Sequence, residues 1–361
     1  MLSIPSIIAA ARARRCSDVH IVRGMPVQLR IDGSLNPITP AAGVIDPADC
    51  TPLTDANCDA YAHELLGDKY DDALRVGEAD LATTYGDVRC RINVFRQQNS
   101  FSAAIRLLND TIPVLADLGL PAVVSTFPTY QRGIVIVTGE TGSGKSTTLA
   151  AILNHINHNR YEHIITLEDP VEYIYKPEKC IINQREVGRD TGSFASGLRA
   201  SLREDPDVIL VGEMRDLETI EIALTAAETG HLVFGTLHTN SAPDSIDRMV
   251  DVFPEGRQRQ IRMQLSMTLR AVVSQQLLVR REGHGRIAAC EIMIVTNAIK
   301  NLIREGKTPQ IANSMATAAS EGSITMDNTL AYMVRNRDIS PKAALDACHD
   351  ADYLSKLIGY R

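Results

Sequence analysis

The stretch that most constrains the fold of this chain is residues 139–147, Gly-Glu-Thr-Gly-Ser-Gly-Lys-Ser-Thr. It fits the pattern G-x-x-x-x-G-K-[ST] of a phosphate-binding loop (P-loop), which requires a strand before it and a helix after it. Residues 133–138 form a β-branched run, typical of a strand buried on both faces of a parallel sheet. Residues 148–153 place their apolar side chains on one side of a helix. The order strand, loop, helix therefore predicts a nucleoside triphosphate site.

The residues of this loop have separate roles in such a site. Its glycines let backbone N–H groups turn toward phosphates, and the helix that follows adds positive potential. We expect Lys145 to reach the β- and γ-phosphates of ATP and the Ser146 hydroxyl to bind Mg²⁺. The residues predicted to bind the nucleotide are Gly139, Thr141, Gly142, Ser143, Gly144, Lys145, Ser146 and Thr147.

The composition is that of an ordinary globular protein. A chain of 361 residues exceeds what one hydrophobic core usually spans, so we expect two domains. The net charge of −7 argues against a general nucleic-acid or anionic-membrane surface, because both require clustered Lys and Arg. No run reaches the length of about 18 apolar residues that a membrane span needs, and the seven cysteines contain no C-x-x-C pair. These features predict a cytoplasmic protein without a disulfide framework or a zinc site.

Residues 1–108 are predicted to form a small α+β domain. An amphipathic helix opens it, and because the arginines follow the apolar part of this helix it does not resemble a secretory signal. Asp32-Gly33 is expected to form a turn. Strands are expected at 18–22, 27–31, 79–85, 88–97 and 100–107, with a helix at 55–66. The last three strands predict an antiparallel meander.

Residues 109–125 are expected to be a linker, beginning with the break Asn-Asp-Thr-Ile-Pro at 109–113. Residues 126–361 then alternate strand and helix, which indicates a parallel α/β sheet. Strands are expected at 134–138, 163–167, 207–211 and 231–236. From about residue 290 helices are expected to dominate, including 297–304 and 326–336.

Two of these strands are predicted to end in acidic residues, at the edge where open α/β sheets bind ligands. Glu213 follows the strand at 207–211 and is our candidate general base or water-orienting group. Glu168 is expected to contact the Mg²⁺ shell through water, because Mg²⁺ prefers oxygen ligands and keeps its own water. Asp169 has an alternative interpretation as a turn-former before Pro170.

Two histidines, His231 and His238, bracket the next predicted strand and are both candidate catalytic residues. We expect His238 to donate to the γ-phosphate or to report its loss. The alternative is that each is a structural histidine with its hydrogen bonds satisfied inside the fold.

These motifs together resemble the secretion-ATPase superfamily, and most closely its PilT family of type IV pilus retraction ATPases. The resemblance is carried by the P-loop, the acidic box at 167–172, residues 199–207, the Walker B element at 211–216 and the His box at 229–239. It implies an α/β protein with an N-terminal PAS-like α+β domain, hinged to a RecA-like P-loop ATPase core with a helical C-terminal end. It also implies a ring-shaped homohexamer that hydrolyses ATP.

Residues 298–305, Ala-Ile-Lys-Asn-Leu-Ile-Arg-Glu, resemble the element associated with retraction, and the tetracysteine zinc module of pilus-extension ATPases is absent from the sequence. The chain departs from the family at Glu140, where proline is usual, and at Lys300, where the bidentate contacts of an arginine are lost. A PilT-like ATPase of a type IVB secretion system is the alternative. A DNA-translocating RecA-like ATPase is less favoured, because the chain is acidic and only 4% aromatic.

The resemblance also gives the arginines of the N-terminal domain a role. It implies that Arg91 and Arg106 project onto the nucleotide, and alternation along a strand gives Arg89 the same face as Arg91. The alternative is that these are solvated charges on a sheet. Arg199 and Arg203 share a helical face and either bind phosphates or join subunits; the sequence leaves both open.

The partners implied by the resemblance are an inner-membrane pilus platform protein, and a pilus-extension ATPase or regulators, with no nucleic acid. Loss of the γ-phosphate would let the two domains swing about the linker and turn the platform, drawing pilin out of the filament for twitching motility. The implied location is the cytoplasmic face of the inner membrane, with peripheral association through the platform.

Overall fold

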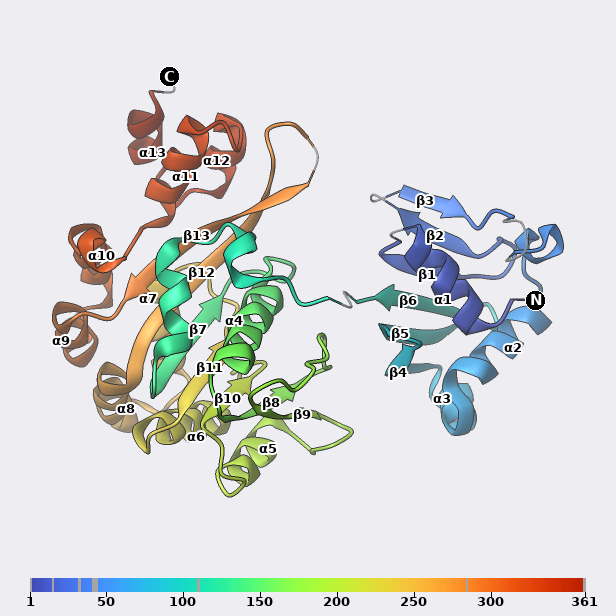
Figure 1. Ribbon diagram of the computed structural model, residues 1–361, viewed down its shortest axis with the longest axis horizontal. Coiled ribbons are helices and arrows are strands. Elements are labelled where there is room, and N and C mark those ends of the chain that lie inside the picture. Colours follow the sequence, from blue (N-terminus) through green and yellow to red (C-terminus); the bar gives the residue numbers. More distant parts are fainter. Residues whose placement is uncertain are drawn as a thin grey trace. The chain divides into compact units, whose positions relative to one another are not determined.

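The computed structural model describes residues 2–14, 16–31, 34–40, 45–108, 111–283 and 285–359. The chain divides into two compact units, Met1–Thr111 with Glu172–Ile174, and Ile112–Val171 with Tyr175–Arg361 (Figure 1). The predicted turn Asp32-Gly33 and the first two predicted linker residues, Asn109 and Asp110, lie outside the described residues. Each unit has its own sheet and its own hydrophobic core.

The first unit is a six-stranded sheet in the order β3-β2-β1-β6-β5-β4, with every neighbouring pair antiparallel. Its strands are β1 (Asp18–Ile21), β2 (Gln28–Ile31), β3 (Ser34–Pro37), β4 (Glu78–Tyr85), β5 (Val88–Gln97) and β6 (Ser100–Leu107), and its helices are α1 (Ile4–Ala13), α2 (Asp55–Leu66) and α3 (Tyr70–Val76). The predicted meander of the last three strands is confirmed. The short elements β3 and α3 are not predicted by the sequence.

Local sequence explains how the helices of this unit form. Ile4, Ile7 and Ile8 of α1 are buried in the core of the unit, as their spacing predicts. The side chain of Thr54 accepts from the backbone N–H of Asn57 and caps α2, while Gly67 ends that helix with a positive φ of 50°. The apolar faces of these helices complete the core on the sheet.

The second unit is a seven-stranded sheet in the order β13-β12-β7-β11-β10-β8-β9. All neighbouring pairs are parallel except β12 and β13, which are antiparallel. Its strands are β7 (Gly133–Thr138), β8 (His163–Glu168), β9 (Ile181–Glu186), β10 (Val208–Val211), β11 (Leu232–Thr236), β12 (Leu269–Val279) and β13 (Arg286–Ile294). The four predicted strands of the parallel sheet are confirmed, and β9, β12 and β13 are additional.

The helices of the second unit lie between and after these strands. They are α4 (Lys145–Asn159), α5 (Phe194–Ser201), α6 (Leu217–Glu228), α7 (Ala242–Asp251), α8 (Glu255–Thr268), α9 (Asn297–Glu305), α10 (Ile311–Thr317), α11 (Met326–Arg335), α12 (Pro341–Ala347) and α13 (Ala351–Ile358). The C-terminal helical region begins after Ile294, because β13 extends beyond residue 290, where helices are expected to take over. Among the described residues, none of the helices is long and apolar enough to cross a lipid bilayer.

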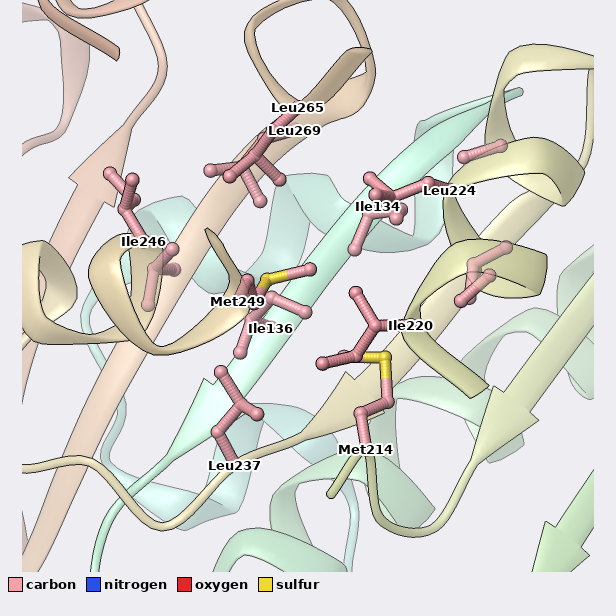
Figure 2. Packing of buried hydrophobic residues seen from close by; sticks show 14 of the residues in the cluster. Ile134, Ile136, Met214, Ile220, Leu224, Leu237, Ile246, Met249, Leu265 and Leu269 are labelled. Carbon is pink, nitrogen blue, oxygen red and sulfur yellow. The ribbon is translucent and has the colours of Figure 1, made fainter. Parts of the chain in front are cut away.

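The core of the second unit holds β7 in place. Figure 2 shows Ile134 and Ile136 of β7 facing Ile220 of α6 and Met249 of α7, and all four are at most 1% exposed. Burying each such side chain contributes about 1.5–3 kcal/mol. The strand that leads into the P-loop is therefore rigidly held, and the loop starts from a fixed point.

Candidate nucleotide-binding site

The P-loop lies between β7 and the first turn of α4, as predicted. Gly139, Gly142 and Gly144 have positive φ angles of 135°, 84° and 91°, which L side chains rarely adopt. The ammonium of Lys145 donates to the carbonyl oxygens of Gly139 at 2.7 Å and Glu140 at 2.9 Å. The lysine thus folds back over its own loop, where a phosphate is the stronger acceptor.

Two of these glycines are also required by a close neighbour on β12. A Cβ atom at Gly139 would lie 2.2 Å from the carbonyl oxygen of Gln275, and one at Gly144 would lie 2.7 Å from Gln275 Nε2. The Gln275 side chain donates to the carbonyl of Ser143 at 2.8 Å and accepts from the hydroxyl of Thr148 at 2.9 Å. Gln275 is a residue of the site that the sequence does not predict.

The parallel strands β7, β11 and β10 end at the same level in the sheet. Near the end of β7, Val137 pairs with Thr236 of β11, and Gly235 of β11 pairs with Val211 at the end of β10. Val211 in turn pairs with Leu167, the residue before Glu168. The P-loop, His238, Glu213 and Glu168 therefore follow neighbouring strands at one edge of the sheet, the edge where parallel sheets bind ligands.

At this edge Glu213 and His238 are in direct contact, which the sequence alone does not predict. Nε2 of His238 lies 2.8 Å from Oε1 of Glu213. The Glu213 carboxylate also accepts a hydrogen bond from Arg215, and its side chain is only 18% exposed. The carboxylate is thus oriented by two neighbours, and the side chain that bears it remains partly exposed.

Glu168 is held in a similar way at the end of β8. Its Oε1 accepts from the hydroxyl of Thr166 at 2.6 Å and from the amide of Gln184 on β9 at 3.3 Å. Asp169, the next residue, is exposed. Ser146 is exposed in the first turn of α4, and Thr141 and Gly142 are exposed in the loop. The hydroxyl of Ser146 and the carboxylate of Glu168 are oxygen donors of the kind that Mg²⁺ prefers.

A cavity of about 310 Å³ lies beside the loop, within the second unit. Its walls combine Gly144, Thr147 and Thr148 with apolar Leu277 and Ile287, the guanidinium-bearing Arg280 and Arg286, and residues 117–120. Such a pocket of apolar walls and a few polar groups is typical of a small-molecule site. The sequence gives no signal for it, because the lining residues come from four separate segments.

The structure does not bring His231 to this edge. The backbone N–H of Gly133, the first residue of β7, donates to the carbonyl of His231 at 3.0 Å, so His231 lies beside the start of that strand. The P-loop follows the other end, roughly 20 Å away at about 3.3 Å per residue. Nδ1 of His231 lies 2.9 Å from the carbonyl oxygen of Ala226. Within the second unit, His231 is therefore separated from Glu213 and His238.

The remaining basic candidates of the second unit lie at its surface. Arg199 is hydrogen-bonded to Glu218, and Arg203 is exposed. In α9, Ile299 and Ile303 are fully buried in the core of the unit, whereas Asn301 and Arg304 are exposed. The packing of α9 is therefore that of an ordinary amphipathic helix with a polar outer face.

In the first unit, Arg91 and Arg106 lie directly opposite each other on β5 and β6. Both are exposed, and Arg89, two residues from Arg91, is 9% exposed. Nε of Arg106 donates to Asp18 at 2.9 Å. Partial burial opposes ionisation of Asp18, but the hydrogen bonds from Arg106 and Ser17 outweigh it and lower the pKa of this carboxyl. Arg106 is therefore held by a carboxylate on the neighbouring strand.

A P-loop at the carboxyl edge of a parallel sheet, with an oriented glutamate on the second strand from it, defines a P-loop ATPase. The family model described as "Type II/IV secretion system protein" matches residues 81–338. PilT of Pseudomonas aeruginosa, the type IV pilus retraction ATPase, is 44% identical over 345 residues, which are 95% of this chain and 97% of that protein. The chain belongs to the PilT family of type II/IV secretion ATPases.

Solved structures agree with this assignment. The crystal structure of the pilus retraction motor PilT with bound ADP is 44% identical and matches with a TM-score of 0.89, over 99% of this chain and 100% of that chain. The ATPase DotB of Legionella pneumophila is 26% identical with a TM-score of 0.78, over 94% and 93% of the two chains. The predicted fold class, an N-terminal sheet domain followed by a P-loop ATPase core, is confirmed.

Proposed function

We propose that this chain is an ATP-hydrolysing motor that powers type IV pilus retraction. The observation that carries the proposal is the likeness to PilT over the length of both units, together with the oriented Glu213 beside the P-loop. The identity to PilT exceeds that to DotB, 44% against 26%, which favours retraction over a type IVB secretion role. The DNA-translocating alternative finds no support in the relatives described above.

The nucleotide would bind with its phosphates in the P-loop and its nucleoside in the adjoining cavity. Lys145 would exchange the carbonyl oxygens of Gly139 and Glu140 for the β- and γ-phosphate oxygens. Backbone N–H groups of the loop and the start of α4 would add donors and positive potential. Mg²⁺, held by Ser146 and through water by Glu168, would neutralise phosphate charge.

Hydrolysis requires a water aligned with the γ-phosphorus. Glu213 would accept a hydrogen bond from that water and take its proton as the oxygen bonds to phosphorus, and ADP would leave as the bond to the γ-phosphate breaks. His238, 2.8 Å from the same carboxylate, would orient Glu213 and donate to the phosphate oxygens. The products are ADP and inorganic phosphate.

The first unit would contribute Arg91 and Arg106. Two exposed arginines lie opposite each other on neighbouring strands, and Asp18 offsets part of the charge of Arg106. The positive charge that remains suits the charge that develops on a transferred phosphoryl group. We propose that phosphate release frees them, so that the units turn about the linker near Pro113. His231, at the far edge of the sheet, has no part in this chemistry within one chain.

The assembly is proposed by likeness to the family. We infer a homohexamer at the cytoplasmic face of the inner membrane, attached peripherally through a pilus platform protein, with a pilus-extension ATPase or regulators as further partners. Arg199 and Arg203, exposed at the surface of the second unit, are candidates for contacts between subunits.

Two measurements test the proposal. Purified protein should hydrolyse ATP at a rate that DNA does not change; stimulation by DNA with a steep salt dependence would instead support a translocase. Deleting the gene in its host should abolish twitching while leaving pili on the surface, and the intact gene should restore it. A deletion strain that twitches normally but fails to secrete would contradict the retraction role.

A further inference from the structure

Three consecutive polar residues, Ser274, Gln275 and Gln276, interrupt the apolar sequence of β12. Ser274 is fully buried and Gln275 is 2% exposed. A buried amide is costly unless its oxygen and nitrogen both find partners. The partners of these side chains therefore indicate what the strand does.

The partners of Gln275 both belong to the phosphate-binding segment. Its nitrogen donates to the carbonyl of Ser143 at 2.8 Å, inside the loop, and its oxygen accepts from the hydroxyl of Thr148 at 2.9 Å, in the first turn of α4. Pairing between β7 and β12 ends at Thr138 and Ser274. Gln275 is thus the first residue of β12 after its pairing with β7 ends, and it lies directly beside the loop.

The shape of the loop fits this side chain closely. Side chains at Gly139 and Gly144 would collide with the backbone and the amide of Gln275, as shown above. The loop therefore wraps Gln275 from its first glycine to its last. Both hydrogen bonds of the amide are made to groups of the protein itself, so the amide can fix the path of the loop without a ligand as its partner.

We propose that Gln275 is a positioning residue for nucleotide binding, which holds the P-loop in its phosphate-accepting conformation before the nucleotide arrives. This inference rests on the proposed function, because it assumes that the loop binds phosphates. A loop ordered in advance loses less conformational freedom on binding, so the gain appears in affinity. The loop contacts the substrate and the transition state alike, so KM should rise in variants while kcat is retained.

The variant Gln275→Ala should raise the Kd for ADP about tenfold, which corresponds to about 1.4 kcal/mol. The KM for ATP should rise by a similar factor with kcat unchanged. The Kd for AMP should rise by a smaller factor, because AMP lacks the β- and γ-phosphates and keeps only the contacts of its nucleoside and α-phosphate, although Gln275 also lines the cavity proposed for the nucleoside. The matched control is Gln276→Ala, whose amide donates to the carbonyl of Ala347 at 3.2 Å, away from the loop. This control should bind ADP like the wild type.

A second variant, Gln275→Glu, tests whether this side chain lies next to the bound phosphates, because it introduces a negative charge there. In Gln275→Glu the carboxylate still accepts from Thr148 but cannot donate to Ser143, and it adds negative charge next to the phosphates. The Kd for ADP should therefore rise more than in Gln275→Ala, and the Kd for AMP should again rise by a smaller factor than that for ADP. A residue with a merely structural role would not weaken ADP and AMP to different extents.

Isothermal titration calorimetry measures the Kd values of ADP and AMP for each variant, and circular dichroism checks that each variant is folded. Wild-type affinity for ADP in folded Q275A, or an equal loss in Q276A, would overturn the inference. If Q275A does not fold, the isosteric Q275E decides alone by the same criterion. A wild-type protein that binds no ADP would contradict the proposed function itself. A wild-type protein that binds ADP, together with a Gln275 variant that binds it equally well, would contradict only the role of Gln275.

Discussion

The carboxylate of Glu213 is the residue on which turnover should depend most. Glu213→Gln keeps an acceptor for His238 but removes the group that takes a proton from water. We expect kcat to fall by roughly 10²-fold or more, the usual contribution of a general base, with the Kd for ATP little changed. Single-turnover kinetics and titration of the nucleotide measure the two quantities.

The control for this substitution is Glu321→Gln, because Glu321 is an exposed carboxylate of the second unit that has no role in the proposed site or assembly. It should leave kcat at the wild-type value. Normal hydrolysis by E213Q would show that another group orients the water, and the assignment of the base would be wrong.

The position of a site residue can be predicted from the sequence when it depends only on which end of a strand the residue follows. A contact between two residues also requires the order of the strands in the sheet. The P-loop, Glu168, Glu213 and His238 follow predicted strands, and the ends of parallel strands meet at one edge. The contact of Glu213 with His238 needs the further fact that β10 lies beside β11. The position of His231 follows from the same rule, because a residue that opens a parallel strand lies at the end of the strand opposite to the ligand.

At the scale of elements, continuous apolar runs identify the central strands, but the β12–β13 hairpin lacks this signal. Gln275 looks like a surface residue in the sequence, and its partners lie 127 and 132 positions away. Glu291 of β13 is similar: it is 4% exposed and accepts from the backbone N–H groups of Ala242 and Met326. Such strands become recognisable only when the partners of their polar residues are known.

Glu291 should also make stability depend on pH. Burial raises the pKa of its carboxyl above 4.5, against the opposing effects of the Ala242 N–H and of His349, while Asp327 reinforces it. An acid with a raised pKa binds more protons in the folded state, so stability falls as pH rises between about 4.5 and the raised pKa. Lowering the pH through this range should therefore increase the contribution of Glu291 to the stability of the wild type.

Glu291→Gln removes this titration. The difference in melting temperature between the wild type and E291Q should shift in favour of the wild type as pH falls, which calorimetry at several pH values measures. Exposed Glu305→Gln is the control, since the pKa of Glu305 is lowered by Lys307 rather than raised by burial. An unchanged difference across this range would show that Glu291 does not titrate there.

At the scale of the whole molecule, the proposed mechanism places chemical groups on both units. Arg91→Ala and Arg106→Ala should each lower kcat at least about tenfold, since arginines that stabilise phosphoryl transfer contribute 10³–10⁵-fold in other P-loop enzymes. The Kd for ATP should change much less. Arg75→Ala is the matched control, an arginine of the same unit that pairs with Asp72 and has a 78% exposed side chain. Unchanged kcat in both variants would confine catalysis to the second unit.

The same mechanism requires the two units to change their relative arrangement with the state of the nucleotide. Spin labels at Arg75→Cys in α3 and at Tyr161→Cys, which is 83% exposed, would report the distance between the units in solution. Of the native cysteines only Cys50 and Cys348 are not buried, so their replacement by serine gives a suitable background. In a Glu213→Gln protein, ATP is retained without turnover, and its distance distribution should differ from those with ADP and without nucleotide. Because the γ-phosphate is the charge that the arginines are proposed to hold, the largest step should separate ATP from ADP. Identical distributions in all three states would mean that hydrolysis does not move the units, even if every catalytic assignment is right.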